Sequence, residues 1–304
     1  MAEHAALAER IGFDSVWVID SQLLCRDVFV TLTAILSRTT TLRAATGVTQ
    51  PMTRHPSVVA GAMASLAELS GGRAILGVGT GFSSLGTIGK PQARIADVEA
   101  FVGTTRALLA GRNATFDAGI QGRLSWINEP TNVPIVIAAS GPRSTGLAGR
   151  IADGVIIHQG VASAAIDRAM GWLDGAKPEV SCWAPYSLAP TRAEAYDHVR
   201  PRVASALATA RLDWFEGADR DAVARLKAAY DIAGHASSAP DHAALVPDRL
   251  IPGYALAGDP AEVRDNLARL LDHPAVDRVI LTPQVTGPVP DILRDFEKHV
   301  LARL

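Results

Sequence analysis

Short apolar runs alternate along this chain with longer amphipathic stretches, and this alternation limits the possible fold more than any other feature. Most runs are almost continuously apolar, which is typical of parallel strands covered on both faces. The strand candidates are Ser15–Asp20, Leu42–Val48, Arg73–Gly79, Pro134–Ser140, Gly154–His158, Glu179–Leu188 and Arg278–Pro283. The helix candidates are Ala2–Ile11, Val28–Ser37, Pro56–Leu69, Arg94–Ala110, Pro142–Ala152, Ser163–Gly175, Pro260–Leu271 and about Pro290–Arg303. Strict alternation predicts an α/β fold with a parallel sheet, open or closed.

Two segments interrupt this alternation. Ala114–Trp126 predicts a small inserted hairpin, with Gly119 and Gly122 as its turn residues. Thr191–Asp248 predicts a helical insertion, with two helices followed by a loop rich in Ala, Ser, Pro and His. An insertion of this size at the end of a strand is where barrels place a lid or a specificity element.

The strand count leaves two topologies open. The chain begins with a helix that leads into the strand at Ser15, whereas an eight-stranded barrel has another strand before that helix. Either the sheet is open and doubly wound, or the first barrel strand is missing from this chain, for which a start placed too far downstream would be an explanation.

Composition indicates the kind of partner. The formal net charge is -2 and there is no long Lys/Arg block, so nothing favours binding to nucleic acid or to a membrane surface. The segment Met1–Arg10 contains acids and no apolar run, unlike a secretory signal. Cys25 and Cys182 lie far apart without a C-x-x-C motif, which argues against zinc and against a disulfide scaffold. We therefore expect a cytoplasmic protein that acts on a small molecule, and a homodimer is the general expectation.

The most informative local signal is IVIAASGPRSTGLAGRIADG, residues Ile135–Gly154. A buried strand ends at Ser140 and a helix starts near Pro142, where the missing N–H of proline costs nothing. Free backbone amides around Gly141, the guanidinium of Arg143 and the hydroxyl of Ser144 together suit a phosphate. The alternative interpretation is a well-capped helix with an ordinary surface arginine.

Two further strand ends carry weaker signals. GVGTGFSSLG, residues Gly77–Gly86, would let a ligand approach the backbone closely, although a plain tight turn explains it equally well. In ATGVTQPMTRHP, residues Ala45–Pro56, the side chains of Thr46, Thr49 and Gln50 are candidates for hydrogen bonds to a heterocycle.

Four titratable or polar side chains at strand ends and helix starts are ambiguous. His55 precedes a proline at a helix start, so a capping role is the better interpretation of this residue. Asp20, and His158 with Gln159, end two other strands, where barrels place functional groups. Each alone is more often structural, and their repetition at separate strand ends favours a site.

Taken together, three segments resemble the bacterial luciferase-like monooxygenase superfamily, and in particular its deazaflavin-dependent branch that includes methylenetetrahydromethanopterin reductase. They are LAERIGFDSVWVID (Leu7–Asp20), TGVTQPMTRHPSVVAGAMASLAELSGGRAILGVGTG (Thr46–Gly81) and AASGPRSTGLAGRIADGVII (Ala138–Ile157), in the order and spacing of the family. The resemblance is close over about the first half of the chain and looser beyond it.

The resemblance implies a TIM-type (β/α)8 barrel formed as a single domain over residues 1–304, with coenzyme F420 or FMN bound at the carboxyl ends of its strands. It implies that the turn Ser140–Arg143 holds the cofactor phosphate, and that a non-proline cis peptide at Gly47–Val48 forms a bulge beneath the ring. The implied cofactor-binding residues are Thr46, Gly47, Val48, Gly79, Thr80, Gly81, Ala139, Ser140, Gly141, Pro142, Arg143 and His158; Asp20 and His55 are the catalytic candidates.

The chain departs from the family pattern at two places. Ser21 follows Asp20, where many relatives have histidine, and Phe82, Ser83 and Ser84 stand where many have an acid. An F420-dependent reductase or dehydrogenase is the leading interpretation, because hydride transfer depends above all on positioning. The alternatives are an FMN-dependent monooxygenase and a catalytically impaired or truncated flavin-binding homologue.

Overall fold

The computed structural model describes residues 1–284 and 287–304. Contacts within the chain divide it into two compact units. The first unit contains Met1–Ala138 and Arg150–Gly154, and the second contains Ala139–Gly149 and Val155–Leu304. The chain therefore passes between the units around β6 (Ile135–Ala139) and α6 (Pro142–Ile151).

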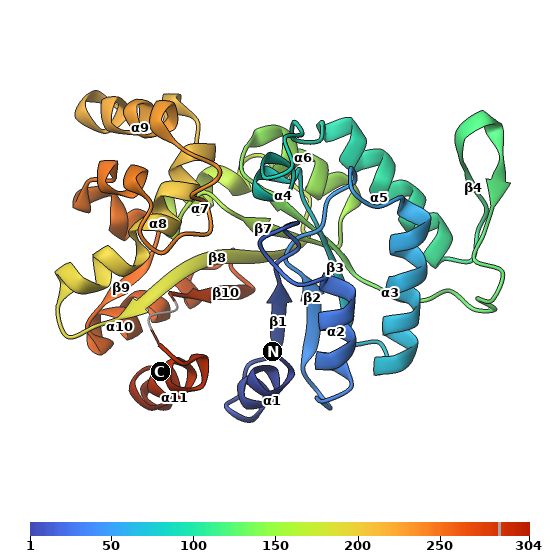
Figure 1. Cartoon of the computed structure of the whole chain (residues 1–304), viewed down its shortest axis with the longest axis horizontal. Helices are drawn as coiled ribbons and strands as arrows, with labels where there is room; N and C mark the ends of the chain where they lie inside the picture. Colours follow the sequence, from blue (N-terminus) through green and yellow to red (C-terminus); the bar gives the residue numbers. More distant parts are fainter. Residues whose placement is uncertain (285–286) are drawn as a thin grey trace. The chain divides into compact units, whose positions relative to one another are not determined.

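The first unit is built on parallel strands in the order β1, β2, β3, β6. Helices α2 and α3 lie beside these strands (Figure 1), and α5 packs against α3. The strands are β1 (Ser15–Val18), β2 (Arg43–Thr46), β3 (Ala74–Val78) and β6 (Ile135–Ala139). The helices are α1 (Ala2–Arg10), α2 (Val28–Leu36), α3 (Pro56–Ser70), α4 (Phe82–Gly86) and α5 (Ile95–Leu109).

The register of these strands brings their carboxyl ends to one edge of the sheet. Val18, the last residue of β1, is paired with Thr46, the last residue of β2. On the other side of β3, Val78 is paired with Ile137 of β6. Loops that follow these residues therefore meet at one edge, which is where functional groups gather in parallel α/β folds.

At the opposite edge, Glu9 of α1 fixes the start of β2. One carboxylate oxygen, Oε1, accepts hydrogen bonds from the backbone N–H groups of residues 40, 41 and 42 at 2.8, 2.6 and 2.8 Å. These bonds, first those from Thr41 and Leu42, lower the pKa of Glu9 to about 2, although burial opposes the shift. The ionised form of Glu9 is the one that holds this turn.

Arg73, just before β3, holds three segments at the same edge. Its guanidinium donates to the carbonyl oxygens of Leu36 at 2.8 Å and Leu42 at 2.9 Å. Its Nε donates to the carbonyl of Ser70 at 2.9 Å. A cation thus ties the carboxyl ends of α2 and α3 to the start of β2, where the helix dipoles favour positive charge.

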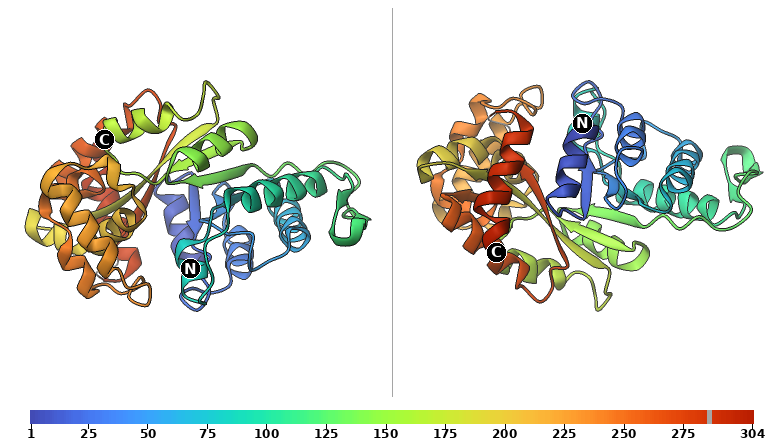
Figure 2. Two further views of the ribbon diagram at one scale, coloured as in Figure 1. Left: turned by 90° about the horizontal axis from the view of Figure 1, so that it is seen from above. Right: turned by 90° about the horizontal axis from the view of Figure 1, so that it is seen from below.

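The predicted hairpin is confirmed and projects from the helices of the first unit (Figure 2). It pairs β4 (Ala114–Thr115) with β5 (Gln121–Gly122) around a short 3-10 turn, η1 (Asp117–Gly119). Gly119 has a φ of 74° and is a turn residue, as predicted. Gly122 is not, because it lies in β5 and pairs with Ala114.

In the second unit, both β9 and β10 pair with β8. β10 runs parallel to residues 181–186 of β8, and β9 runs parallel to its last three residues. The strands are β7 (Gly154–Ile157, whose first residue belongs to the first unit), β8 (Glu179–Leu188), β9 (Leu256–Gly258) and β10 (Arg278–Pro283). The remaining helices are α7 (Ser163–Met170), α8 (Arg192–Thr209), α9 (Gly217–Ala229), α10 (Pro260–Leu271) and α11 (Val289–His299); 3-10 turns are η2 (Leu212–Trp214), η3 (Asp241–Leu245), η4 (Asp248–Gly253) and η5 (Leu301–Arg303).

The helical insertion has its own apolar core. As predicted, it contains two helices, α8 and α9, followed by an irregular stretch that here forms η3 and η4. Val199, Val203 and Leu207 of α8 are buried against Val223 and Leu226 of α9. The insertion is therefore a packed body and not a loose loop.

The seven predicted strands are all present, and two elements were missed. β9 has only three residues, and α4 lies within the glycine-rich segment, for which a ligand-binding or plain tight turn and no helix was predicted. The predicted helix Ser163–Gly175 ends earlier, at Met170. Within the described residues, no helix is both long enough and apolar enough to cross a membrane.

Candidate functional site

The turn that follows β2 is held tightly between its two neighbouring strands. The peptide bond between Gly47 and Val48 is cis, at the place that the family resemblance implies. The N–H of Gly47 donates to the carbonyl of Val18 at 2.7 Å. On the other side, the N–H of Thr49 donates to the carbonyl of Gly77 at 3.0 Å, and the N–H of Gly79 donates to the carbonyl of Thr49 at 2.8 Å. Backbone bonds therefore fix the turn from both sides.

Gly77 in β3 and Gly79 just after it leave space for this turn. An ideal Cβ on Gly77 would lie 2.1 Å from the carbonyl oxygen of Thr46, and one on Gly79 would lie 2.8 Å from Cγ2 of Val48. The hydroxyl of Thr46 also donates to the carbonyl of Gly77 at 2.7 Å and accepts from its N–H at 2.8 Å. The side chain of Thr46 thus supports the turn, so any contact between this residue and a cofactor would come from its backbone.

Gly81 closes the glycine-rich segment. Its φ of 80° is in the left-handed region, where glycine is favoured, and it precedes the first residue of α4. The neighbouring Thr80 donates its hydroxyl to Oε1 of Gln92 at 3.1 Å. The expected closeness of residues 79–81 to a cofactor remains a prediction.

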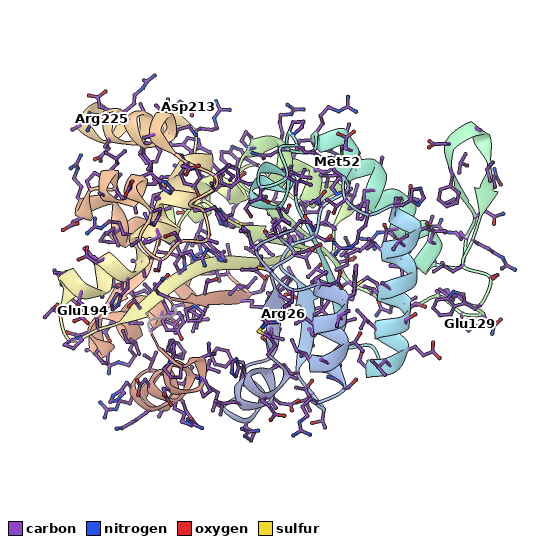
Figure 3. The ribbon with its side chains drawn as sticks, in the orientation of Figure 1. Arg26, Met52, Glu129, Glu194, Asp213 and Arg225 are labelled. Atoms are coloured by element: carbon purple, nitrogen blue, oxygen red, sulfur yellow. The ribbon has the colours of Figure 1, made fainter. Side chains whose placement is uncertain are left out.

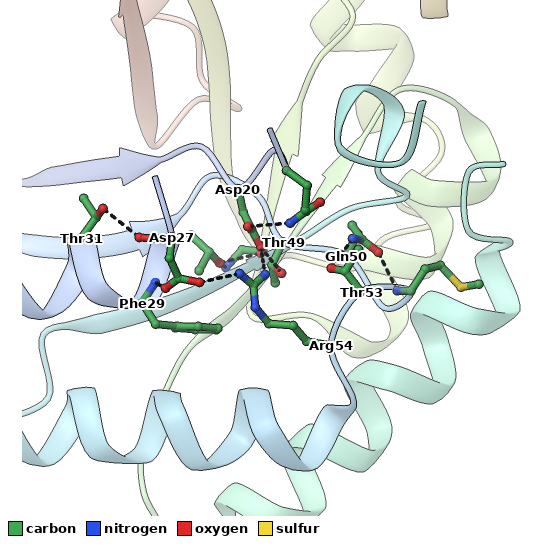
Figure 4. A network of polar contacts seen from close by, with 12 residues as sticks. Asp20, Asp27, Phe29, Thr31, Thr49, Gln50, Thr53 and Arg54 are labelled. Carbon is green, nitrogen blue, oxygen red and sulfur yellow. Dashed lines mark hydrogen bonds and ion pairs between the residues drawn. The ribbon is translucent and has the colours of Figure 1, made fainter. Parts of the chain in front are cut away.

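Asp20 is the centre of a buried polar network in the first unit (Figure 4). Its side chain is 3% exposed, and its Oδ2 accepts from Nη1 of Arg54 at 2.5 Å and from the hydroxyl of Thr49 at 2.7 Å. Oδ1 accepts from Nε2 of Gln22 at 3.1 Å. Arg54 uses its other terminal nitrogen on Asp27 at 2.9 Å.

This network gives Asp20 a positioning role. Its carboxylate is held by the guanidinium of Arg54, and it fixes Thr49, whose backbone bonds hold the turn after β2. Asp27 caps α2 and has a lowered pKa; burial opposes this shift, and the N–H of Val30 and the guanidinium of Arg54 outweigh it. No local pattern in the sequence indicated that Arg54 would join two aspartates.

Two other candidate side chains are used within the loop that follows the turn. Nδ1 of His55 accepts from the N–H of Ser57 at 3.3 Å. His55 therefore caps α3, which is the role that the sequence favoured for it. Nε2 of Gln50 donates to the hydroxyl of Thr53 at 2.6 Å, and its Oε1 accepts from the N–H of Met52 at 2.5 Å. Gln50 is fully buried, so it shapes the loop from within.

The two departures from the family pattern lie side by side. Ser21 and Ser83 share a hydrogen bond between their hydroxyls at 2.9 Å, although 62 residues separate them. Ser21 is buried, and Ser83 lies on α4. Neither group is a strong acid or base near neutral pH, so this corner offers hydrogen bonding and no obvious proton donor.

The second unit contains the predicted phosphate turn at the start of α6. The carbonyl of Gly141 accepts from the N–H of Thr145 at 3.0 Å, which makes Gly141 the capping residue and leaves the amides of Arg143 and Ser144 in the first turn. An ideal Cβ on Gly141 would meet no atom within 4 Å. Arg143 is exposed and has no salt bridge within the described residues.

The hydroxyl of Ser144 is already used at this turn. It donates to the carbonyl of Gly141 at 3.0 Å and accepts from the N–H of Gly141 at 3.3 Å, so it stabilises the cap. The amide of Gly141 is therefore not free, contrary to the prediction. Ala139 lies just before the turn, is buried and accepts at its carbonyl from the N–H of His158 at 3.1 Å. Ser140 and Pro142 are partly exposed. The open glycine, the first-turn amides and the exposed guanidinium have the chemistry of an anion site.

His158 lies directly after β7, in the same unit. Its ring stacks on that of Trp183 with a centroid distance of 4.1 Å. Burial lowers the pKa of His158 to about 4, so the ring is neutral at pH 7. The structure thus brings Asp20, the Gly47–Val48 turn and the glycine-rich segment together in the first unit, and the α6 turn and His158 into the second.

Comparison with known proteins places this geometry in context. The family model described as "Luciferase-like monooxygenase" matches residues 1–278. The 5,10-methylenetetrahydromethanopterin reductase of Methanolobus tindarius is 32% identical over 290 residues, which cover 90% of this chain and 86% of that protein. The F420-dependent glucose-6-phosphate dehydrogenase of Nakamurella multipartita is 37% identical over 178 residues, but the match covers only 53% of this chain and 52% of that protein.

A solved structure supports the fold over the whole chain. The coenzyme F420-dependent tetrahydromethanopterin reductase from Methanopyrus kandleri has a TM-score of 0.80 and 20% identity, and the match covers 99% of this chain and 94% of that one. The fold is therefore of the luciferase-like α/β-barrel type, and the alternative of an open doubly wound sheet is not correct.

Proposed function

Because the chain belongs to the luciferase-like monooxygenase family, we propose that it is an oxidoreductase that uses coenzyme F420 to reduce or oxidise a small organic molecule. The observation that carries the choice of cofactor is the likeness to a methylenetetrahydromethanopterin reductase over 90% of the chain. The proposal treats both units as one domain, because the family match includes residues of each.

The residues at the α6 turn fit the phosphate of such a cofactor. Gly141 leaves open space where any other residue would place a Cβ, and Arg143 is exposed and unpaired within the described chain. Backbone amides in the first turn of a helix and a guanidinium are both strong donors to a phosphate oxygen. We assign the phosphate to these groups.

Within the first unit, the turn after β2 has the place that the family resemblance gives to support of a cofactor ring. Val48 projects over Gly79 at the carboxyl edge of β3, and the backbone bonds of Thr49 keep the turn in place. When bound, a deazaflavin supplies hydride transfer at its ring. This chain would then contribute positioning, since Asp20 accepts a hydrogen bond from Thr49 of the turn and is itself held by Arg54.

Equilibrium titration with F420 and with FMN tests the proposal directly. We expect F420 to quench the intrinsic tryptophan fluorescence saturably at micromolar concentrations, and FMN to bind at least tenfold more weakly. Binding of neither would remove the proposal. Tight binding of FMN alone would favour the second candidate, an FMN-dependent monooxygenase, for which the description of the matched family is the support.

Substitution of Arg143 tests the phosphate assignment. We expect Arg143→Ala to weaken cofactor binding by about 1–3 kcal/mol, the range for a hydrogen bond to a charged group. Arg150→Ala is the matched control, because Arg150 lies in the last turn of the same helix and its nearest carboxylate, that of Glu99, is 3.9 Å away. Equal affinities for the two variants would contradict the assignment.

The proposal also covers the partners, the location and the oligomeric state of the enzyme. A small-molecule substrate without a nucleic-acid or membrane partner is supported by the net charge of -2. A cytoplasmic location and a homodimer belong to the same proposal. Size-exclusion chromatography with light scattering would test the dimer, and a monomer at micromolar concentration would contradict it.

A further inference from the structure

An open groove lies beside the second half of α3 in the first unit. Its volume is about 400 Å³, and it is lined by residues between Ala64 and Gly72 on one side and between Trp126 and Asn132 on the other. The second side belongs to the segment that connects the hairpin to β6, on which Glu129 is labelled in Figure 3. Gly72 and Asn132 stand shortly before β3 and β6, so the groove is at the amino edge of these strands.

The buried residues that line the groove are apolar. Ala64 is 1% exposed, Ala67 is 5% exposed and Ile127 is 7% exposed. An ideal Cβ on Gly71 or Gly72 would meet no atom within 4 Å, so the space beside both glycines is open. A ligand can therefore contact apolar surface and also approach the backbone at the end of α3.

Trp126 contributes an exposed aromatic face to this groove. Its side chain is 48% exposed. Among the described residues, its ring has no aromatic or cationic partner and its Nε1–H donates no hydrogen bond. Tryptophan is enriched at binding interfaces, because it supplies a large apolar area together with one donor. The face of an indole is also the best aromatic partner for a cation.

Two carboxylates give the groove a negative charge. Glu68 and Glu129 both line it, are exposed, and make no ion pair with any residue that the structure describes. Glu68 is in the last turn of α3, which contains no basic residue, and the helix dipole disfavours an acid there. Arg73 follows closely, but it directs its guanidinium to the backbone carbonyls of residues 36, 42 and 70. The charge of the groove is therefore left for a cation from outside.

Thr131 and Asn132 add polar groups to the same groove. Neither the hydroxyl of Thr131 nor the amide of Asn132 has a hydrogen-bond partner within the described part of the chain. An amide side chain can both donate and accept, so it matches the N–H and C=O groups of a peptide backbone. The groove thus offers partners for a peptide as well as for a cation.

We propose that this groove binds an arginine side chain that is presented by a peptide segment of another protein. A guanidinium is planar, so it can stack on the indole of Trp126 while its N–H groups donate to Glu68 and Glu129. A lysine ammonium has no plane to stack and is more strongly hydrated. The proposal does not depend on the proposed function, because the groove and the carboxyl-end loops lie at opposite edges of the strands.

Titration with the tripeptide acetyl-Gly-Arg-Gly-amide tests the groove in the absence of any cofactor. The readout is the fluorine NMR spectrum of protein labelled with fluorotryptophan, in which the signal of Trp126 is assigned by its loss in Trp126→Phe. We expect this signal to shift saturably with a Kd of about 1 mM. The same tripeptide with citrulline in place of arginine has nearly the same shape and no charge, and it should bind at least tenfold more weakly.

Replacement of the two acids tests the source of the affinity. Glu68→Gln combined with Glu129→Gln should weaken binding of the arginine tripeptide about tenfold, because two exposed ion pairs are lost. Asp117→Asn is the matched control, since Asp117 is exposed on the neighbouring hairpin and does not line the groove. Glu68→Gln alone should leave the urea midpoint unchanged or raise it, because the acid opposes the helix dipole. A lower midpoint would give Glu68 a structural role and contradict the proposal.

The remaining outcomes identify the occupant. No saturable shift of the Trp126 signal, or equal affinities for the arginine and citrulline tripeptides, would overturn the proposal. Equal binding of a lysine tripeptide would overturn the assignment to arginine. Arginine amide that binds as tightly as the tripeptide would overturn the assignment to a peptide. A dimer that light scattering detects in the wild type and not in Trp126→Ala would give the groove to a second copy of this chain.

Discussion

Replacing Asp20 by alanine removes the carboxylate on which the polar network of the first unit depends. The side chain of Asp20 is 3% exposed and that of its partner Arg54 is 17% exposed, so the variant leaves a guanidinium largely buried beside an empty space. It also removes the acceptor for the hydroxyl of Thr49 at 2.7 Å. Both the stability of the unit and the position of the turn after β2 should respond.

The magnitude follows from the environment of the pair. Breaking a buried ion pair by removing one partner costs about 3–5 kcal/mol, because the remaining charge stays buried. Arg54 retains Asp27 at 2.9 Å, and the side chain of Asp27 is 48% exposed, so we expect the lower end of this range, about 3 kcal/mol. Asp20→Asn keeps a neutral acceptor and should lose about half as much.

Urea unfolding at pH 7 measures these losses as shifts of the midpoint at constant slope. Asp27→Ser is the control, because serine still caps α2 while the ion pair with Arg54 is lost, and exposed pairs are worth about 0–1 kcal/mol. A loss for Asp20→Ala within about 1 kcal/mol of that for Asp27→Ser would refute the reasoning. Cofactor affinity, measured on the folded variants, should fall with Asp20→Ala and stay unchanged with Asp27→Ser.

Three further outcomes are expected. Gly77→Ala should lower the free energy of unfolding by about 1–3 kcal/mol or more, because its Cβ would lie 2.1 Å from the carbonyl oxygen of Thr46; an unchanged urea midpoint would contradict the packing. Since the folded pKa of Glu9 is depressed from 4.5 to about 2, its contribution is present above pH 4.5 and disappears as the pH falls towards 2. The melting temperatures of wild type and Glu9→Gln should therefore differ at pH 7 and converge in acid; a constant gap would be inconsistent with this. Cys25 is exposed, whereas burial raises the pKa of Cys182 to about 12, so a thiol reagent should label one cysteine in the folded protein and both in denaturant; fast labelling of Cys182 would argue against its burial.

Much of the fold could be read from the sequence because buried parallel strands have a simple signature. The run RAILGVG predicts β3, whose five residues are all buried. β9 escaped prediction because it has three residues and ends in glycine, too little for any periodic pattern. Its place is set by pairing with Tyr186–Leu188 of β8, a contact between distant parts of the chain that no local pattern records.

The candidate site was predictable only in part. The position of the bend at Gly47–Val48 came from the family resemblance, and the backbone geometry agrees with it. The joining of Asp20 and Asp27 by Arg54 depends on residues up to 34 positions apart, so it was out of reach of local reasoning. The pairing of Ser21 with Ser83 was hidden for the same reason.

The hydrogen bonds of Arg73 affect which parts of such an enzyme can vary in sequence while the fold is kept. This guanidinium aligns α2, α3 and β2 from the edge opposite the carboxyl-end loops. Libraries that randomise exposed loop residues at the carboxyl edge should consequently yield a high share of folded variants, whereas any library that includes position 73 should yield few. The chemistry at the carboxyl edge can therefore change during evolution, while Arg73 keeps α2, α3 and β2 aligned at the opposite edge.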